Sequence, residues 1–293
     1  MERSYIMYLT VKANTPLAPF CSMKVGGNAK YIGTPENIDE LNSIIEFMSD
    51  KNEKIMILGN ASNTLFSDEG FDGAVIFTTH INEIKTEGNR ITAYCGASLT
   101  SVAVAAQKNF LSGLEFAYGI PGTVGGGVFM NAGAYGGEIS DCFYEAVCLT
   151  PDLKEVVLTK QDMNFYYRHS VLSENSYTLI KATFELKNGD NEAIRTKMDE
   201  FMRMRKDKQP LEYPSCGSTF KRPKDNYAGC LIEQCGLKGF SIGGAEVSEK
   251  HAGFIINKGN ASANDIIKLI DYVSDFVFEK TGVRLEPEVR IIR

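Results

Sequence analysis

A glycine-rich segment constrains the fold of this chain more than any other feature. It holds eight glycines, at positions Gly119, Gly122, Gly125, Gly126, Gly127, Gly133, Gly136 and Gly137. Because glycine lacks a Cβ and adopts positive φ readily, backbone rather than side chains must line whatever this segment contacts. Consecutive backbone N–H groups can then converge on one anionic group, typically a phosphate. The interspersed Ile120, Val124 and Val128 are too apolar for a flexible linker. The segment therefore predicts a binding loop for an extended, phosphate-bearing cofactor.

A second backbone-rich turn lies upstream of this segment. The apolar run 55–58 predicts a buried strand, and it breaks into the turn Gly59-Asn-Ala-Ser-Asn63. Alone, such a turn is typical of an ordinary strand-to-loop junction. The glycine-rich segment is not the Rossmann fingerprint, because Pro121 and the triple glycine interrupt the helix that should start there. Two such loops in one chain favour a shared pyrophosphate cradle.

Composition limits the partners of such a cradle. The chain has 293 residues, of which 43% are hydrophobic, so it can bury a full core and form two or three domains. A net charge of −6 argues against a nucleic-acid partner and favours small molecules. No window is long enough to cross a bilayer, and the start 1–5 lacks the apolar core of a secretory signal, so we expect a cytoplasmic protein with no membrane partner. Seven cysteines without C-x-x-C pairs predict free thiols, and only three histidines predict no metal site.

Hydrophobic periodicity predicts an α+β protein with three domains. Residues 1–80 form a small βαβ-like domain, whose helix is expected to start at Thr34 with Pro35 in its first turn. Residues 81–190 form a second domain that contains the glycine segment and several strands. Residues 191–293 form a third domain, which ends in a helix capped by Ser262 and closed by Gly282.

Three further segments carry polar groups that are candidates for a functional role. Arg168 stands among aromatic residues, Ser218 lies in a turn framed by glycine and prolines, and Glu286 and Glu288 flank Pro287. Taken singly, each segment has a structural explanation that is as good as a functional one. Arg168 fits a surface cation, Ser218 fits a turn hydroxyl, and the two glutamates fit a solvated strand edge.

Taken together, these segments and the two glycine-bearing loops resemble the UDP-N-acetylenolpyruvoylglucosamine reductase family. The resemblance runs from Met23-Lys-Val-Gly-Gly27 to Pro287-Glu-Val-Arg290, and the segment 236–251 is similar to the substrate domain of that family. It implies an FAD-binding fold of the p-cresol methylhydroxylase type, made of two subdomains (1–80 and 81–190), followed by a C-terminal α+β substrate-binding domain. It also implies a role in peptidoglycan precursor synthesis, and hence in cell-wall biogenesis, cell shape and cell division. NADPH would reduce the flavin, which would then reduce the enolpyruvyl ether of UDP-N-acetylglucosamine to UDP-N-acetylmuramate.

The resemblance implies which residues bind the flavin. They share the two loops and the end of the glycine segment: Leu58, Gly59, Asn60, Ala61, Ser62, Asn63, Gly119, Ile120, Pro121, Gly122, Gly125, Gly126, Asn131, Ala132, Gly133 and Tyr135. These loops contain no histidine or cysteine, so FAD is expected to be non-covalent. Ala61 stands where the family usually has glycine, which matters only if φ is positive there or the backbone approaches the pyrophosphate closely. No long insertion lies between Phe184 and Pro210, so the chain resembles the shorter type of the family, which lacks an extra substrate loop.

The same resemblance implies the catalytic groups. Arg168 and Glu288 would lie at the substrate carboxylate and stabilise an enolate-like species, while Ser218 would protonate the carbon next to that carboxylate. Lys221, Lys208 or an ordered water could assist Ser218, and the sequence does not choose among them. Lys208 and Arg222 match positions that contact the substrate's diphosphate or pyruvyl end.

Two other classes of function remain open at this point. One is a flavin oxidoreductase on the same fold that oxidises an alcohol or 2-hydroxy acid with oxygen or a quinone as acceptor. The other is a flavin- or nucleotide-binding module without catalytic activity. The oligomeric state is open as well, with a monomer as the default expectation.

Overall fold

A computed structural model describes residues 10–293 and divides them into two compact units. Unit 1 comprises residues 10–12, 32–60 and 74–204, and unit 2 comprises residues 13–31, 61–73 and 205–293. The start 1–5, from which we expect no secretory signal, lies outside the described residues. In the part of the chain that is described, no helix has both the length and the apolar character of a membrane span.

The first sheet has four strands in the order β1-β2-β5-β3. Its strands are β1 (Val11–Pro16), β2 (Asn28–Gly33), β3 (Ile55–Leu58) and β5 (Phe71–Phe77), with β3 and β5 parallel. Helix α2 (Ile38–Asp50) buries Leu41, Ile44 and Met48. The expected start of this helix at Thr34 is wrong, because the side chain of Asn37 accepts the Glu40 N–H and caps the helix three residues later.

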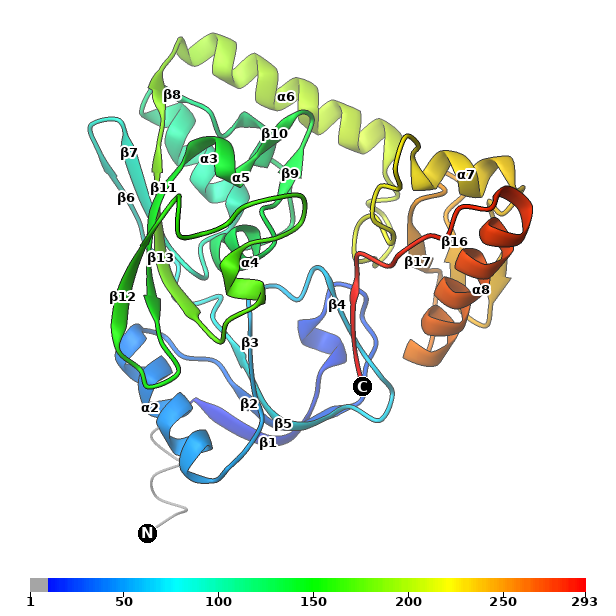
Figure 1. Cartoon of the computed structure of the whole chain (residues 1–293), viewed down its shortest axis with the longest axis horizontal. Helices are drawn as coiled ribbons and strands as arrows, with labels where there is room; N and C mark the ends of the chain where they lie inside the picture. Colours follow the sequence, from blue (N-terminus) through cyan, green and yellow to red (C-terminus); the bar gives the residue numbers. More distant parts are fainter. Residues whose placement is uncertain (1–9) are drawn as a thin grey trace. The chain divides into compact units, whose positions relative to one another are not determined.

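The main sheet of unit 1 has five antiparallel strands in the order β12-β11-β13-β7-β6 (Figure 1). They are β6 (Ile84–Glu87), β7 (Arg90–Tyr94), β11 (Phe143–Leu149), β12 (Glu155–Thr159) and β13 (Thr178–Glu185). Along β13 the inward residues Ile180, Ala182 and Phe184 are buried, as their alternation with polar residues predicts. Helix α3 (Leu99–Lys108) is capped by Ser98, whose hydroxyl accepts the Ser101 N–H.

The glycine segment folds into a series of short elements in unit 1. They are η2 (Glu115–Ala117), α4 (Val124–Phe129), β9 (Gly133–Ala134), β10 (Gly137–Glu138) and α5 (Ile139–Cys142). The expectation that the triple glycine prevents a helix start is wrong. The hydroxyl of Thr123 accepts the N–H of Gly126 and caps α4, while Val124 and Val128 are fully buried and anchor the helix.

The remaining elements of unit 1 frame this segment. They are β8 (Leu111–Ser112), η3 (Val171–Ser173), β14 (Lys187–Asn188) and the long helix α6 (Asn191–Lys208), of which residues 205–208 belong to unit 2. The short strands β8 and β14 pair with each other.

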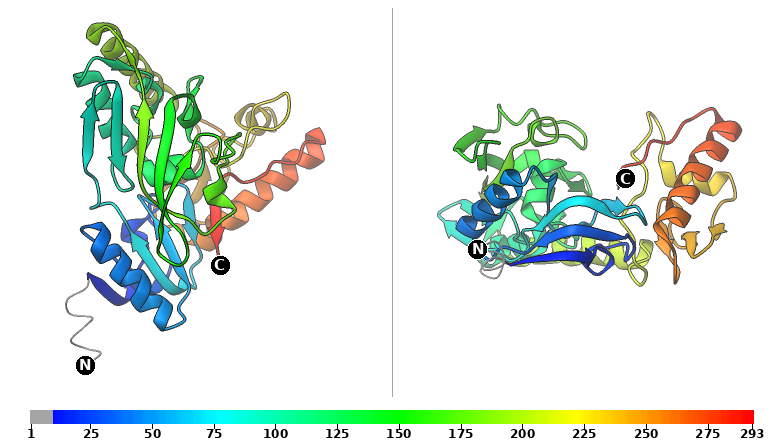
Figure 2. Two further views of the ribbon diagram at one scale, coloured as in Figure 1. Left: turned by 60° about the vertical axis from the view of Figure 1, so that its left-hand side comes forward. Right: turned by 90° about the horizontal axis from the view of Figure 1, so that it is seen from below.

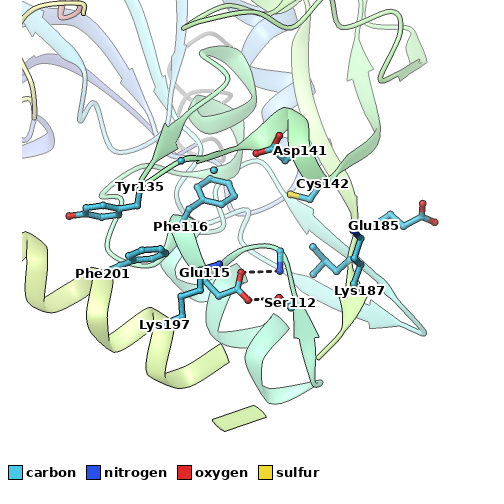
Figure 3. A pocket seen from close by; sticks show the side chains of 14 residues that line it. Ser112, Glu115, Phe116, Tyr135, Asp141, Cys142, Glu185, Lys187, Lys197 and Phe201 are labelled. Carbon is cyan, nitrogen blue, oxygen red and sulfur yellow. Dashed lines mark hydrogen bonds between the residues drawn. The ribbon is translucent and has the colours of Figure 1, made fainter. Parts of the chain in front are cut away.

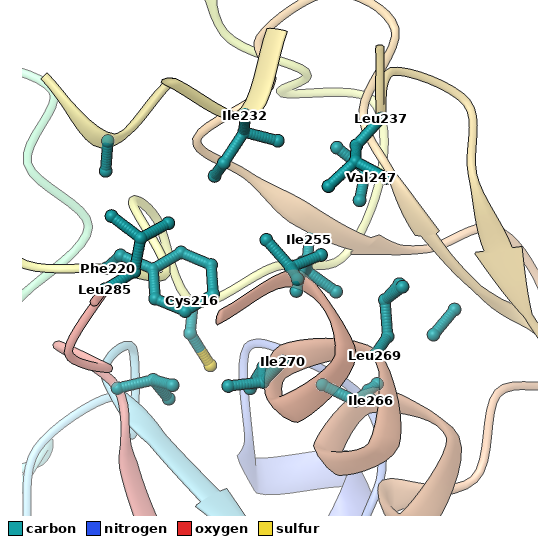
Figure 4. Close-up of a cluster of buried hydrophobic side chains, with 14 of the residues drawn as sticks. Cys216, Phe220, Ile232, Leu237, Val247, Ile255, Ile266, Leu269, Ile270 and Leu285 are labelled. Carbon is teal, nitrogen blue, oxygen red and sulfur yellow. The ribbon is translucent and has the colours of Figure 1, made fainter. Parts of the chain in front are cut away.

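Unit 2 is built around one hydrophobic core. Its elements are η1 (Ala18–Phe20), β4 (Thr64–Phe66), α7 (Ala228–Gln234), β15 (Ser241–Ile242), β16 (Ala245–Val247), β17 (Ile255–Asn257), α8 (Ala263–Thr281) and β18 (Arg290–Ile292). Figures 1 and 2 show α8 (orange to red) running beside the sheet β15-β16-β17. Ile266, Leu269 and Ile270 of α8 pack with Val247 and Ile255 in the core (Figure 4). The predicted caps of α8 are confirmed: Ser262 and Asp265 form a capping box, and Gly282 closes the helix at φ 74°.

Candidate active site

The start of the first glycine-bearing loop, residues 59 and 60, lies beside the glycine segment in unit 1, as the sequence predicts. The side-chain amide of Asn60 donates a hydrogen bond of 3.0 Å to the carbonyl of Pro121. Gly59 also faces Thr123 so closely that an added Cβ would lie 2.0 Å from the Thr123 hydroxyl oxygen. A side chain at Gly59 would therefore drive the two loops apart.

Several backbone N–H groups of the glycine segment donate hydrogen bonds within the protein. The N–H of Gly119 donates to the hydroxyl of Thr100, and that of Gly125 donates to the carbonyl of Cys95. Gly126 is exposed, and an added Cβ would meet nothing nearer than the Thr123 hydroxyl oxygen at 3.9 Å. Packing within the protein therefore does not require glycine at 126, whereas close approach of a ligand would. This open, side-chain-free surface beside the first loop fits an extended, phosphate-bearing cofactor.

Ala61, which stands where the family usually has glycine, has a positive φ, the conformation that favours glycine. Its φ is +44° and it is buried. In this left-handed region an L-residue with a Cβ is strained by about 1–2 kcal/mol, and glycine is not. The condition stated from the sequence is thus met, and the first loop carries local strain.

The end of the glycine segment supports the turn that carries Arg168. The amide of Asn131, which is fully buried at φ +45°, donates to the Tyr166 carbonyl at 3.2 Å and accepts the Ser140 N–H at 2.9 Å. The hydroxyl of Ser170 donates to the Phe129 carbonyl at 2.7 Å. Since both polar atoms of the Asn131 side chain have protein partners, a contact of this residue with a cofactor would come from its main chain.

Arg168 occupies a strained position in this turn. The turn is closed by backbone bonds between Tyr166 and His169, whose rings stack at 3.7 Å, and Arg168 has φ +56°. Its guanidinium donates to the carbonyl of Gly133 at 3.4 Å, and it lies 5.0 Å from the ring of Tyr167. His169 is buried and its ring nitrogens lie within hydrogen-bonding distance of Asn164 and Glu174, which matches a structural histidine. Strain of this kind at a charged residue is typical of functional sites.

Tyr135 lines a pocket in unit 1. Its ring stacks on Phe201 of α6 at 4.7 Å, and the pocket of about 370 Å³ extends past Phe116, Glu115 and Lys197 (Figure 3). The buried carboxylate of Glu115 accepts bonds from the Ser112 hydroxyl and the Gly113 N–H. The side chain of Tyr135 is thus packed against α6, while its backbone, at φ +52°, shapes the turn between β9 and β10.

Ser218 and Glu288 are carried by adjacent segments of unit 2. The N–H of Glu288 donates to the carbonyl of Thr219 at 2.8 Å, and Phe220 forms a bridge with Pro287. Ser218 is exposed and follows Gly217, which has φ +73°. Unit 2 therefore pairs the backbone segments that carry Ser218 and Glu288, whereas Arg168 belongs to unit 1.

The predicted cationic residues have varied surroundings in unit 2. The ammonium of Lys221 pairs with Glu286 at 3.2 Å on the surface. The guanidinium of Arg222 lies 4.1 Å from the ring centre of Tyr227, and Lys208 is exposed at the end of α6. Exposed ion pairs of this kind contribute little to stability.

Sequence reasoning missed Thr219. Its buried hydroxyl accepts the N–H of Ile255 at 3.0 Å, and its own N–H donates to the carbonyl of Gly253 at 2.9 Å. Thr219 thereby fixes the segment that carries Ser218. No local signal could have revealed this, because its partners lie more than thirty positions along the chain.

Cysteine and metal chemistry have little support at this site. Burial raises the pKa of the Cys216 thiol to about 12, so it remains protonated and unreactive at neutral pH. Among residues 10–293, no three side chains of His, Cys, Asp or Glu are grouped as metal ligands.

Comparisons with known proteins give two family matches. Residues 29–158 match the family described as FAD binding domain, and residues 209–292 match UDP-N-acetylenolpyruvoylglucosamine reductase, C-terminal domain. A UDP-N-acetylenolpyruvoylglucosamine reductase of Caldicellulosiruptor saccharolyticus is 51% identical over 100% of this chain and 94% of its own length. The enzyme of the same name from Latilactobacillus sakei is 48% identical over 97% of this chain and 94% of its own length.

A solved structure agrees with these matches. The crystal structure of UDP-N-acetylenolpyruvylglucosamine reductase from Thermus caldophilus superposes with a TM-score of 0.84 at 32% identity, over 98% of this chain and 100% of the other. The predicted α+β fold, an FAD-binding fold of the p-cresol methylhydroxylase type with a C-terminal domain, is confirmed.

Proposed function

The chain belongs to the UDP-N-acetylenolpyruvoylglucosamine reductase family, and from this membership and the geometry of its loops we propose how its residues carry out the reaction. It is an FAD-dependent oxidoreductase of peptidoglycan precursor synthesis. NADPH is the reductant in this proposal, the enolpyruvyl ether of UDP-N-acetylglucosamine is the substrate, and UDP-N-acetylmuramate is the product. The three domains proposed are 1–80 and 81–190 for the cofactor and 191–293 for the substrate.

The two loops and the end of the glycine segment hold FAD without a covalent bond. The supporting observation is the contact of Asn60 with Pro121, together with the open surface at Gly126. When bound, FAD would supply the redox chemistry, relaying a hydride from NADPH to the vinyl carbon of the sugar nucleotide. NADPH and the sugar nucleotide bind in alternation, which predicts ping-pong kinetics.

Arg168 and Glu288 stabilise the charge that develops on the substrate. Hydride addition leaves negative charge spread over the adjacent carbon and the carboxylate, and fixed donors lower the barrier by meeting that charge. The guanidinium of Arg168 is always charged and can bond a carboxylate with two parallel hydrogen bonds. Its strained turn, braced on the glycine segment by Asn131, holds it in place. Glu288 assists only in its protonated form, since a carboxylate cannot donate a hydrogen bond.

Ser218 donates the proton to the carbon next to the substrate carboxylate, on the face opposite the hydride. The exposure of its hydroxyl and the Thr219–Glu288 backbone bond beside it support this role. Lys208 and Arg222 bind the anionic end of the substrate, for which cationic side chains are suited.

The contact between the two loops and the pairing of Thr219 with Glu288 carry this proposal, and separating the two half-reactions tests it. In wild type, NADPH should bleach the flavin, and the enolpyruvyl sugar should restore its colour much faster than oxygen does. In Ser218→Ala, bleaching should keep its rate, whereas recovery should slow by about 10²–10⁴-fold because the general acid is lost. Ser215→Ala, in the same segment, is the matched control and should retain both rates.

Three outcomes would contradict the proposal. Recovery driven equally well by oxygen would favour an oxidase on the same fold. A colourless protein that does not take up FAD would favour a nucleotide-binding module. If both half-reactions survive in Ser218→Ala, another group supplies the proton.

A further inference from the structure

The peptide groups on both sides of Glu288 are held by hydrogen bonds within unit 2. Its N–H donates to the Thr219 carbonyl at 2.8 Å, and its carbonyl accepts the side-chain amide of Asn63 at 3.0 Å. Thr219 directly follows the proposed proton donor, and Asn63 is the last residue of the first flavin loop. The backbone from which the Glu288 carboxyl extends is therefore fixed by both neighbouring segments.

The Asn63 side-chain bond is additional to the strand pairing beside it. Strands β4 and β18 pair in parallel register from Thr64 opposite Arg290, and the N–H of Arg290 donates to the Asn63 carbonyl at 3.0 Å. These bonds use backbone atoms only, so they persist when the side chain of Asn63 is changed. The amide of Asn63 reaches back from the start of β18 to Glu288, two residues before the first residue that pairs with β4.

We propose that Asn63 is a positioning residue for Glu288: its side-chain amide holds the Glu288 peptide so that the carboxyl is aimed at the substrate carboxylate. This inference rests on the proposed function, because it assigns Asn63 a role through Glu288. It differs from the expectation that Asn63 acts as a flavin ligand, since the amide nitrogen is directed at a protein carbonyl.

Asn63→Asp tests the role with a minimal change of shape. The substitution replaces the donating NH₂ by an oxygen that faces the Glu288 carbonyl, while the backbone bonds of residue 63 are retained. Loss of an orienting hydrogen bond behind a reacting group typically costs about 10- to 100-fold in rate. We therefore expect flavin recovery by the enolpyruvyl sugar to slow by about that factor, with bleaching by NADPH and FAD affinity close to wild type.

Asn60→Asp is the matched control in the same loop. The Asn60 amide makes the same kind of bond, but to Pro121 of the glycine segment. It should therefore weaken FAD binding and, at saturating FAD, leave the recovery step less affected than Asn63→Asp does.

A double-mutant cycle with Glu288→Ala, which removes the side-chain donor altogether, separates positioning from a general structural effect. If Asn63 acts through the Glu288 carboxyl, Asn63→Asp should slow recovery by less than about 3-fold in the Glu288→Ala background, because coupled residues are not additive. Additive losses would overturn the proposal, as would a defect confined to FAD affinity. If Asn63→Asp does not fold, Asn63→Gln, which keeps the donor, and Asn63→Ala take its place. Failure of all three to fold would overturn positioning in favour of a structural role.

The wild-type protein distinguishes this inference from the proposed function. If wild-type flavin is not reoxidised by the enolpyruvyl sugar, the proposed function fails before any variant is compared. If wild type responds and Asn63→Asp recovers at the wild-type rate, only the role of Asn63 fails.

Discussion

Gly126→Ala should stabilise the apoprotein and weaken FAD binding at the same time. Gly126 lies in the first turn of α4, where alanine is a better helix former than glycine by up to about 1 kcal/mol. An added Cβ meets only the Thr123 hydroxyl oxygen, at an ordinary contact distance of 3.9 Å, so no packing strain offsets that gain. The melting temperature of the apoprotein should therefore rise by up to about 2–4 °C.

The effect on FAD has the opposite sign because, in the proposed function, the cofactor fills the open side of Gly126. A backbone N–H bonds an oxygen at about 2.9 Å, whereas a methyl carbon needs roughly 3.5 Å or more from its neighbours. The added Cβ should push the cofactor away from the loop and weaken FAD binding at least about tenfold, equivalent to about 1.4 kcal/mol. Titration of the apoprotein with FAD, followed by flavin fluorescence, measures the loss of FAD affinity. Thermal unfolding without FAD measures the gain in stability of the apoprotein.

Gly127→Ala is the matched control in the next position of the same helix. Its Cβ would lie 3.0 Å and 3.1 Å from the methyl carbons of Leu99, so overpacking should destabilise the apoprotein by about 1–3 kcal/mol. The two neighbouring substitutions are thus predicted to change the stability of the apoprotein in opposite directions. If Gly126→Ala binds FAD with wild-type affinity, the cofactor does not approach α4, and the reasoning from the open surface is refuted.

Two further predictions concern stability. Burial lowers the pKa of His251 below its usual value of 6.5, and its Nδ1 accepts the Gly253 N–H at 3.1 Å. As pH drops, the unfolded chain therefore binds a proton at this histidine before the folded protein does, and the free energy of unfolding should fall below about pH 6.5. Urea unfolding at pH 7.5 and 5.5 measures this fall, which His251→Asn should lack. An equal fall in wild type and His251→Asn would contradict the prediction. Ala61→Gly should relieve the strain at φ +44° and raise the free energy of unfolding by roughly 0.5–1 kcal/mol after the entropy cost of glycine. A decrease in that free energy would show that Ala61 is not strained.

The sequence predicted the elements whose signals are local. The strand at 55–58, the alternation along β13 and the capping box of α8 each depend on neighbouring residues, and all three are confirmed. The expectation that the strand at 55–58 is buried is wrong, because its four side chains are only partly buried. The start of α2 was misplaced because two consecutive polar stretches offered caps, at Thr34 and at Asn37, and only the second directs its side chain to a helix N–H.

Contacts between distant segments could not be predicted in the same way. The motifs named Ser218, Glu288 and Asn63 separately, but the bonds that join their segments connect residues up to 225 positions apart. Likewise, the triple glycine forms a helix because the flanking valines bury themselves and Thr123 caps it. The burial of these valines offsets the low helix propensity of glycine, and a prediction from propensity alone does not include the surrounding core.

The first glycine-bearing loop, which we propose binds the flavin, combines local backbone strain with two side-chain anchors. Asn60 is tied to the glycine segment and Asn63 to Glu288, so both ends of a stretch of four residues are anchored by side-chain amides. Between these anchors lies Ala61 in the left-handed region, a conformation that persists only when the surroundings over-determine it. Removing either anchor should therefore loosen Ala61 as well as the contact that the anchor makes. It follows that Asn60→Asp and Asn63→Asp should each increase hydrogen exchange at the Ala61 and Ser62 amides, although the first is expected to weaken FAD binding and the second to slow flavin recovery.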